Sequence, residues 1–347
     1  MAKTETALIA MSGGVDSSVA AHLMLSQGAD CIGATMQLNG DENWADAAAV
    51  ADRLGIPFQL IDGQNAFKKY VQEHFVRSYE SGLTPNPCIE CNKHLKFGLL
   101  LEKAPEMGCD TVVTGHYAKI SHSNGRYYLS KAADLPKDQT YFLYGLTQHQ
   151  LAHSCFPLGS LTKEQVRRIA AEEGFLNAKK RDSQDICFVP NGDFMDFIRQ
   201  FTKKTYTQGD YLDLEGNTVG RHNGAIAYTL GQRKGLGIAL GAPVYVCAKD
   251  MENNTVTVGP NEALFSRELL ADDWNWMRIS GIQEPLRASA KARSRMTEQP
   301  ATVYPEENGM IRVVFDEPQR AITPGQAVVL YDGDDVIGGG TIRTVLD

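Results

Sequence analysis

Short apolar segments alternate with amphipathic segments along about the first 200 residues of the chain. Apolar runs of strand length occupy residues 6–11, 31–36, 58–61 and 110–114, and helical periodicity marks residues 16–27, 45–54, 65–79 and 193–201. The first helix shows this pattern clearly, with apolar side chains at Val19, Ala20, Leu23 and Met24. Because strands that alternate with helices form parallel sheets covered on both faces, this region predicts an α/β fold.

Beyond about residue 202 the pattern changes to short β-like runs separated by Gly, Asn and Asp turns. These runs occupy residues 242–248, 255–258, 288–296, 311–315, 327–331 and 336–342. Their spacing predicts an all-β module. The Gly-rich residues 209–241 indicate a smaller unit between the two regions.

Composition narrows the class of protein but does not identify its function. The 347 residues are 43% hydrophobic and 22% charged, which is typical of a globular protein and excludes wholesale disorder. The 34 basic and 42 acidic residues give a net charge of −8, which argues against a generally basic, non-specific nucleic-acid binder. A local basic surface stays open, because net charge averages over all faces. No apolar run reaches the ~18 residues of a membrane helix and residues 7–11 are too short for a signal peptide, so we expect a cytoplasmic protein without a membrane partner.

The first predicted strand runs into a loop with the sequence Ser-Gly-Gly-Val-Asp-Ser-Ser, residues 12–18, and the first predicted helix begins there. Paired glycines let backbone N–H groups approach an anion, and a helix N-terminus adds unpaired donors and a positive dipole end. Asp16 would repel a phosphate, so we expect it to hold Mg²⁺ or to cap the helix. An ordinary capped turn is the alternative, but the complete string favours a phosphate site. The chain has no Walker-type G-x-x-x-x-G-K-[ST] sequence.

This loop resembles the PP-loop of the N-type ATP pyrophosphatases. Members of that superfamily cleave ATP between the α and β phosphates and adenylate a substrate oxygen. The resemblance implies ATP and Mg²⁺ as cofactors. It does not choose among the ligases and tRNA thiolases that share the loop.

The seven cysteines are odd in number and lack a secretory context, which favours reduced thiols over a disulfide scaffold. Four of them adjoin apolar segments and are expected to be small buried side chains: Cys31, Cys109, Cys155 and Cys247. Cys88 and Cys91 follow a Pro-rich stretch, and a helix expected from about Asn92 would place Cys91 near its N-terminus and lower the pKa of its thiol. Cys187 follows the basic residues 179–181, which would favour a thiolate, although Asp182 and Asp185 oppose it. A zinc half-site is disfavoured because the chain has no second C-x-x-C.

Taken together, these segments resemble the tRNA-specific 2-thiouridylase (MnmA/TrmU) family. The matching segments are residues 10–18, 84–97 (TPNPCIECNKHLKF), 114–118 (TGHYA), 137–143 (KDQTYFL), 182–188 (DSQDICF), 228–237 (YTLGQRKGLG) and 323–326 (TPGQ). The resemblance implies ATP-dependent 2-thiolation of the wobble uridine of certain tRNAs. It also implies a PP-loop domain, a small central domain and a C-terminal, tRNA-contacting β-barrel, which we assign to residues 1–201, 202–262 and 263–347.

The resemblance also implies roles for individual residues. Cys187 would carry the donor persulfide, and Cys91 would attack or resolve it, ending in a Cys91–Cys187 disulfide. Adenylation of the uridine C2 oxygen would create the leaving group that the persulfide sulfur displaces. The residues expected to bind ATP are Ala10, Met11, Ser12, Gly13, Gly14, Val15, Asp16, Ser17, Met36 and Gly115. The residues expected to contact tRNA are Asn86, Pro87, Cys88, His116, Lys137, Asp138, Gln139, Arg293, Ser294 and Gln326. A persulfide-donating sulfurtransferase or a cysteine desulfurase would be the partner protein.

One departure from the family pattern leaves an alternative open. Many members have Asp where this chain has Cys88, so general acid–base catalysis by a carboxylate at that position is in doubt. Cys88, Cys91 and Cys187 would instead offer three ligands for an iron–sulfur cluster, as in another type of PP-loop thiolase.

A basic stripe is the second candidate RNA contact. Arg287, Lys291, Arg293 and Arg295 share odd parity in a segment without acidic residues, so a strand over 288–296 would project them from one face. Such a stripe would bind phosphates, whereas a solvated strand face is the plain alternative. Residues 203–204 and 233–234 would extend it.

Overall fold

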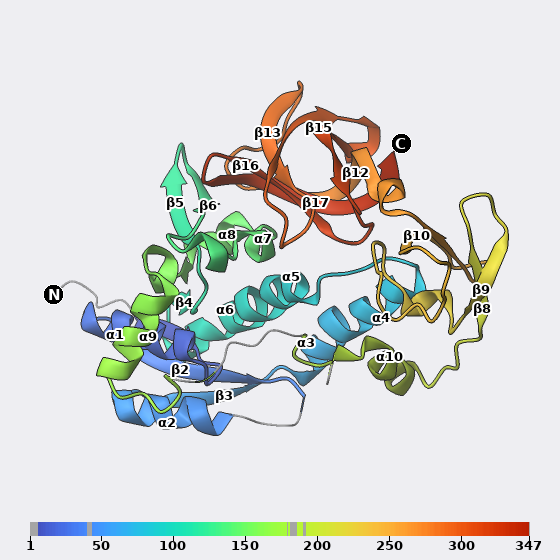
Figure 1. Cartoon of the computed structure of the whole chain (residues 1–347). Coiled ribbons are helices and arrows are strands. Elements are labelled where there is room, and N and C mark those ends of the chain that lie inside the picture. The colour runs from blue at the N-terminus through green and yellow to red at the C-terminus, as the bar shows by residue number, and fades with distance from the viewer. Residues whose placement is uncertain (1–5, 40–43, 179, 181–185, 190–191, 347) are drawn as a thin grey trace.

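A parallel sheet forms the centre of the N-terminal region (Figure 1). The computed structural model describes residues 6–39, 44–178, 180, 186–189 and 192–346. The five strands are β1 (Thr6–Ala10), β2 (Asp30–Gln37), β3 (Phe58–Asp62), β4 (Thr111–Val113) and β7 (Ser154–Cys155). Their order is β3-β2-β1-β4-β7, and every neighbouring pair is parallel. The α/β prediction is therefore confirmed, although the short strand β7 was not predicted.

Helices cover both faces of this sheet. Ala7 and Ile9 face a core shared with α1 (Val15–Ser26), α2 (Trp44–Leu54) and α9 (Lys163–Glu172). Leu8 points to the opposite face and packs with residues of α6 (Leu100–Lys103). This alternation along β1 explains why the strand is apolar at consecutive positions.

Two long helical stretches near the site each combine α-helical and π-helical segments. The first runs through α3 (Gln64–Phe67), a π-helical turn η1 (Lys68–Gln72) and α4 (Glu73–Glu80), close to the predicted helix over 65–79. The second runs through α5 (Pro87–Cys91), a π-helix η2 (Asn92–Leu99) and α6. Shorter helices follow at α7 (Thr140–Leu143) and α8 (Gln148–Ala152), and α10 (Phe194–Thr202) ends the region.

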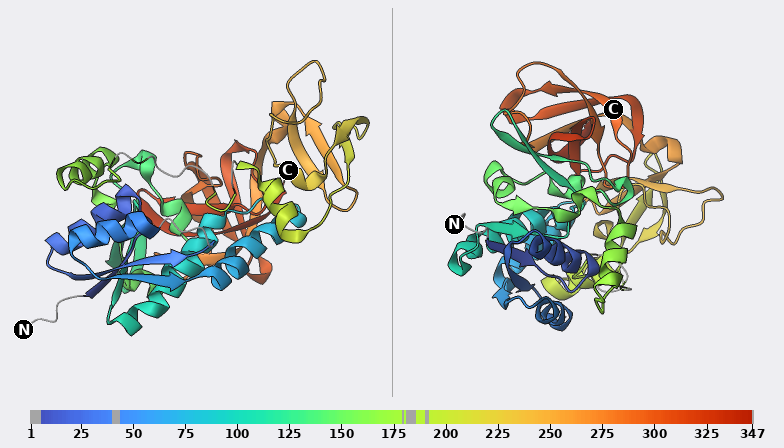
Figure 2. Two further views of the ribbon diagram at one scale, coloured as in Figure 1. Left: turned by 90° about the horizontal axis from the view of Figure 1, so that it is seen from below. Right: turned by 90° about the vertical axis from the view of Figure 1, so that its left-hand side faces the viewer.

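The central region is a four-stranded sheet of order β10-β11-β8-β9. Its strands are β8 (Gly209–Leu212), β9 (Thr218–His222), β10 (Tyr245–Asp250) and β11 (Thr255–Gly259). Its own apolar core is built around the fully buried side chains of Tyr211, Val246 and Val256. This small sheet lies beside the barrel and α10 (Figures 1 and 2).

The C-terminal region is a closed six-stranded β-barrel. Its strands are β12 (Phe265–Trp276), β13 (Leu286–Lys291), β14 (Gln299–Pro305), β15 (Ile311–Arg320), β16 (Ala327–Asp332) and β17 (Asp335–Leu346). The order β12-β15-β14-β13-β16-β17 closes because β12 also pairs with β17. The predicted barrel is confirmed, but the predicted strand over 288–296 ends at Lys291, where the chain leaves the ladder with β16.

A hairpin from the N-terminal region joins the barrel. Strands β5 (Lys119–Ser123) and β6 (Arg126–Ser130) form the hairpin, and Ser130 pairs with Asp335 of β17. The Arg126 guanidinium donates to the carbonyl oxygens of Trp276 and Met277 at 2.6 and 2.8 Å. Side chains of α7 and of β16 also share one apolar cluster. The barrel is therefore packed against the α/β region rather than tethered to it.

Within the described part of the chain, no helix combines the length and apolar character that crossing a membrane requires.

Candidate nucleotide and thiol site

A cavity of about 550 Å³ opens at the carboxyl ends of β1, β2 and β4. Of the ten residues predicted to bind ATP, every one except Gly13 lines it. Four lysines join them, namely Lys96, Lys137, Lys163 and Lys180, whereas Asp16 is the single carboxylate among the described lining residues. An excess of cations around a helix N-terminus suits a polyphosphate.

The loop between β1 and α1 takes its shape from its glycines. Gly13 has a positive φ of 69°, a conformation that glycine adopts without strain. Gly14 is the N-cap of α1, and its carbonyl accepts hydrogen bonds from the hydroxyls of Ser17 and Ser18 at 3.1 and 3.0 Å. Asp16 lies in the first turn and does not cap the helix, so that predicted alternative is wrong.

Gly115 allows β4 to approach this loop closely. A Cβ at this position would lie 2.7 Å from the carbonyl carbon of Asp16 and 2.8 Å from the amide nitrogen of Ser17. Both atoms belong to the backbone, so no side-chain rotation can relieve the clash. Gly115 is thus required by the geometry of the cavity wall.

Asp16 is held by two residues that sequence reasoning missed. Lys163 Nζ lies 2.8 Å from both carboxylate oxygens, and the Tyr117 hydroxyl donates to Oδ1 at 2.8 Å. Lys163 is the first residue of α9, which begins at a capping box made by Thr162 and Gln165. The capping box predicts the helix start, but only the fold brings Lys163 to Asp16.

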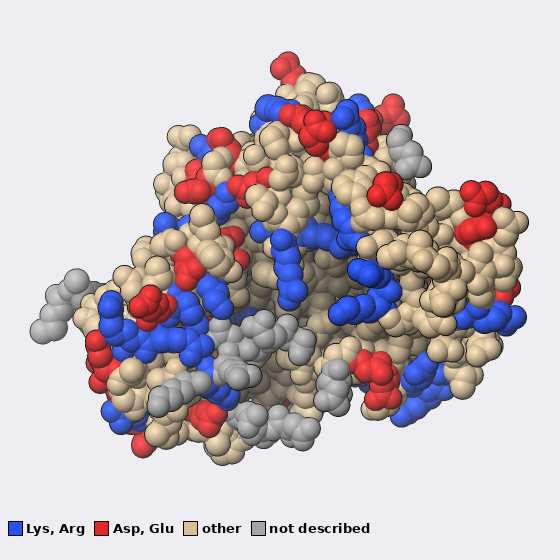
Figure 3. All heavy atoms as spheres, in the orientation of Figure 1, with Lys and Arg blue, Asp and Glu red and all other residues tan. Residues whose placement is uncertain are grey.

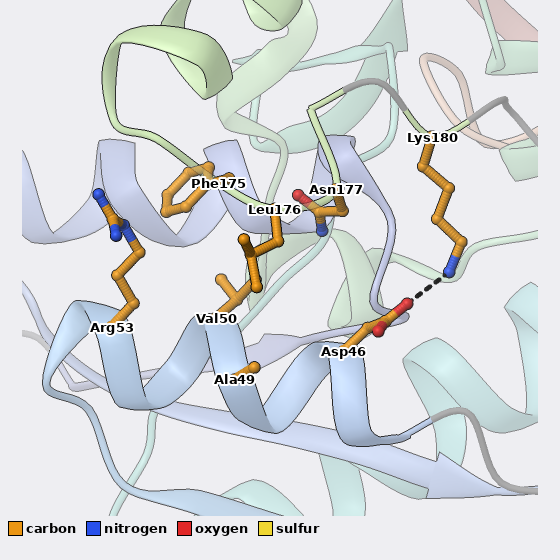
Figure 4. A pocket seen from close by; sticks show the side chains of 8 residues that line it. All are labelled: Asp46, Ala49, Val50, Arg53, Phe175, Leu176, Asn177 and Lys180. Atoms are coloured by element: carbon orange, nitrogen blue, oxygen red, sulfur yellow. Dashed lines mark hydrogen bonds and ion pairs between the residues drawn. The ribbon is translucent and has the colours of Figure 1, made fainter.

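Asn177 supports the loop from the opposite side. Its side-chain amide is buried and donates to the Gly13 carbonyl at 3.2 Å and to the Ser18 hydroxyl at 2.9 Å. A second cavity, of about 490 Å³, lies between α2 and the segment that carries Asn177 (Figure 4). Lys180 belongs to the walls of both cavities, and Asp46 of α2 holds its Nζ at 2.8 Å. Lys180 therefore links α2 to the nucleotide cavity.

The cysteine-bearing helix begins earlier than predicted. The Asn86 side chain accepts a hydrogen bond from the Cys88 amide at 3.2 Å, and Pro87 occupies the first helical position. Asparagine followed by proline is a usual helix start, and the sequence carried this signal. Cys88 thus lies in the first turn, whereas Cys91 lies one turn further along and lines the cavity.

The thiols do not have the lowered pKa values that the sequence predicted. Burial raises the pKa of Cys91 to about 11, against the opposing charge of Lys96. The surrounding protein partly excludes water from the thiols of Cys88 and Cys187 and raises the pKa of both. Both residues nevertheless keep exposed surface. Each neighbouring thiol raises the pKa of Cys91 further, which places the three sulfur atoms in one electrostatic environment. In this state all three are thiols near neutral pH.

Cys187 lies in the short described stretch 186–189. The other members of its motif, residues 182–185, and the basic residues 179 and 181 lie outside the described residues. None of the seven cysteines is in a disulfide. The Cys91–Cys187 disulfide that the resemblance implies is therefore not formed in this state.

Three family models match the chain in succession. They are described as the tRNA methyl transferase HUP domain, over residues 5–191, the tRNA methyl transferase PRC-barrel domain, over 195–260, and the aminomethyltransferase beta-barrel domain, over 266–342. Full-length relatives share the same name, tRNA-specific 2-thiouridylase MnmA. The protein of Clostridioides difficile is 48% identical and that of Acetivibrio thermocellus 49%, over 98% and 97% of this chain and 98% of each relative. The chain belongs to the tRNA-specific 2-thiouridylase family. A relative from Symbiobacterium thermophilum is 46% identical over 98% of this chain and 92% of its own length.

Family motifs from all three regions of the fold meet near the cysteine helix. Gln326 donates to the Thr84 carbonyl at 2.7 Å, and the Thr84 amide donates to the Pro324 carbonyl at 2.9 Å. The Arg293 guanidinium donates to the Leu230 carbonyl at 3.2 Å and to the Thr323 hydroxyl. Segments that are distant in the sequence are thereby joined around one hollow.

The residues predicted to contact tRNA have different surroundings. Lys137, Gln139 and His116 line the cavity. The Asp138 carboxylate instead accepts from the Ala132 amide at 3.0 Å and the Thr140 hydroxyl at 2.5 Å, which turns it inward. Asn86 and Gln326 make the backbone contacts given above, Pro87 is buried, and Ser294 lies with Arg293 in the turn after β13. Their roles toward tRNA stay predictions.

The predicted basic stripe does not form on one strand. Arg287 lies in β13, where its guanidinium pairs with the Asp316 carboxylate of β15. Arg293 and Arg295 follow the end of that strand, so their odd positions no longer place both side chains on one face. Lysine and arginine side chains nevertheless gather around the central hollow, whereas acidic side chains dominate several outer surfaces (Figure 3).

Proposed function

We propose that this protein catalyses the ATP-dependent 2-thiolation of the wobble uridine of tRNA. One observation carries the proposal: Cys91 and the PP-loop line the same cavity. A thiol placed there can take part in replacing a substrate oxygen that ATP has activated by sulfur. The shared name of the relatives supports the substrate and the reaction.

ATP activates the uridine in the first step. The C2 oxygen attacks the α phosphorus, and pyrophosphate leaves. The α1 N-terminus and the cavity lysines would stabilise the triphosphate and the departing pyrophosphate. Mg²⁺ usually takes one or two protein carboxylates and completes its shell with phosphate oxygens, so Asp16 fits a Mg²⁺ that enters with ATP. When bound, that ion would neutralise phosphate charge.

Sulfur transfer follows. The terminal sulfur of a persulfide on Cys187 attacks C2, and AMP leaves. The Cys91 thiolate then attacks the Cys187 sulfur, breaks its bond to the transferred sulfur and forms the Cys91–Cys187 disulfide, which releases 2-thiouridine. The exposure of Cys187 supports loading by a persulfide-donating sulfurtransferase or a cysteine desulfurase.

The iron–sulfur alternative receives no support from the thiol arrangement. Cys88, Cys91 and Cys187 are all described, yet no three His, Cys, Asp or Glu side chains within the described ranges are arranged to hold a metal ion. We propose the persulfide route for this chain, because Cys91 and Cys187 match the family pattern whereas the cluster rests on a count of three thiols alone.

The hollow between the three regions is the proposed tRNA surface. Arg293 projects from the barrel toward segment 228–237, and its half-buried guanidinium makes hydrogen bonds only to neutral oxygens among the described residues. The surrounding lysines and arginines support phosphate binding despite the net charge of −8 (Figure 3). A wobble base in an anticodon loop is unstacked more easily than a paired base, so it can reach a cavity of this kind.

The test combines thiolation, pyrophosphate release and sulfur mapping. Cys91→Ser and Cys187→Ser should each abolish 2-thiouridine formation in a nucleoside mass-spectrometry assay. Both should retain ATP binding, because neither cysteine belongs to the PP-loop. Cys247→Ser, which changes a thiol in β10, is the matched control and should thiolate normally. Full thiolation by Cys187→Ser, or persulfide found only on Cys155 or Cys247, would contradict the proposal.

A further inference from the structure

The cysteine helix changes its winding directly after Cys91. Residues 92–99 form a π-helix, and the Leu100 amide that follows donates to the Leu95 carbonyl five residues earlier. In an α-helix, residues five apart differ by about 140° around the axis. The wider π turn brings such residues back toward the same face, and π segments are frequent at functional sites. Lys96 therefore lies on the cavity side together with Cys91.

A buried histidine orients the Lys96 ammonium. Lys96 Nζ lies 3.4 Å from His116 Nε2, and the Thr114 hydroxyl lies 2.7 Å from His116 Nδ1. The imidazole packs against the rings of Phe97 and Phe156, which also contact each other. Burial and the charge of Lys96 hold the pKa of His116 well below its usual value, so the ring is neutral. Since an ammonium only donates, Nε2 accepts and Nδ1 carries the proton that goes to Thr114.

This arrangement leaves the charge of Lys96 available. A neutral imidazole fixes the ammonium in place without cancelling its charge. Asp16, the single carboxylate among the described lining residues, is already paired with Lys163. Among the residues that the structure describes, the titratable groups that act on Cys91 are Lys96 of η2, Cys88 of α5 and Cys187 of the 186–189 turn, and Lys96 is the cation in this set.

We propose that Lys96 is the positioning cation that stabilises negative charge on the reacting sulfur atoms, with His116 as its neutral support. The role rests on the proposed sulfur transfer. When Cys91 loses its proton to solvent, a fixed ammonium nearby lowers the energy of the thiolate. The same charge also lowers the pKa of Cys88 and of Cys187, so one lysine serves all three sulfur atoms.

Site-resolved alkylation tests this role without ATP or tRNA. Cys91 modification by iodoacetamide is followed against pH, and tandem mass spectrometry separates it from Cys88. Lys96→Gln should alkylate Cys91 about tenfold more slowly than wild type at a given pH, which corresponds to about one pKa unit. Lys96→Arg should keep the wild-type profile, because it retains the charge. Lys93→Gln is the matched control, since Lys93 belongs to the same π-helix but pairs with Asp273 at 3.7 Å.

The outcomes separate this inference from the proposed function. A slower Lys96→Gln profile supports the role of Lys96 even where the wild type fails to thiolate tRNA, a failure that would reject the proposed function alone. An unchanged Lys96→Gln profile overturns the inference. Equal slowing in Lys96→Arg, or in Lys93→Gln, also overturns it, because the positive charge at position 96 would then not be responsible.

Discussion

Replacing Gly115 by alanine should damage the nucleotide cavity, although the change adds only a methyl group and removes no functional side chain. The added methyl group would stand 2.7 Å from the Asp16 carbonyl carbon, whereas ordinary contacts begin at about 3.4 Å. The start of α1 and the end of β4 must therefore separate by about 0.7 Å. Both segments belong to the buried core around β1, which resists such a shift.

Two magnitudes follow from that displacement. Overpacking of this kind costs about 1–3 kcal/mol of unfolding free energy. A displacement approaching 1 Å at reacting groups costs on the order of a hundredfold in rate, so pyrophosphate release should fall by about ten- to a hundredfold. Gly145→Ala is the control, because a Cβ there comes no closer than 3.9 Å to Ile89 and Lys93.

The assay pairs urea unfolding with tRNA-stimulated pyrophosphate release at saturating ATP. Gly115→Ala should lose stability and rate together, and Gly145→Ala should lose neither. Wild-type pyrophosphate release by Gly115→Ala would refute the reasoning, because it would show that catalysis does not depend on this contact.

Three further predictions concern single side chains. Lys163→Met should abolish pyrophosphate release while tRNA binding persists. A wild-type rate of pyrophosphate release would show that Lys163 has no role at the phosphate site. Arg293→Ala should weaken tRNA binding and reduce the slope of log affinity against log salt by about one, as measured by filter binding; an unchanged slope would mean that Arg293 contacts no phosphate. Cys88→Asp should retain most of the thiolation in the persulfide route, whereas loss of activity together with stoichiometric iron in the wild type would favour the cluster.

The sequence was sufficient where short-range rules act. The loop at residues 12–18 follows from a strand, a glycine pair and a helix start that are contiguous in the chain. The hairpin β5–β6 was missed although Asn124 and Gly125 carry its signal, a dipeptide whose positive φ angles of 50° and 74° suit a tight turn.

Other features depend on contacts that no local pattern encodes. Lys163 is 147 residues from Asp16, so their ion pair comes from the packing of α9 on α1. A nearby helix start predicts a lowered pKa for the Cys91 thiol, whereas burial by distant segments dominates and raises that pKa. The strand predicted over 288–296 ends at Lys291, where its pairing with Val329 of β16 stops.

The β5–β6 hairpin has a consequence for synthesis of the chain. The hairpin leaves the ribosome long before the barrel that it joins, since Ser130 and Asp335 are 205 residues apart. Until β17 arrives, β6 is an open strand edge, and such edges promote aggregation. A fragment that stops before the barrel would keep that edge for good, so we expect truncated chains to precipitate and the ATP-binding region to be inseparable from its C-terminal partner.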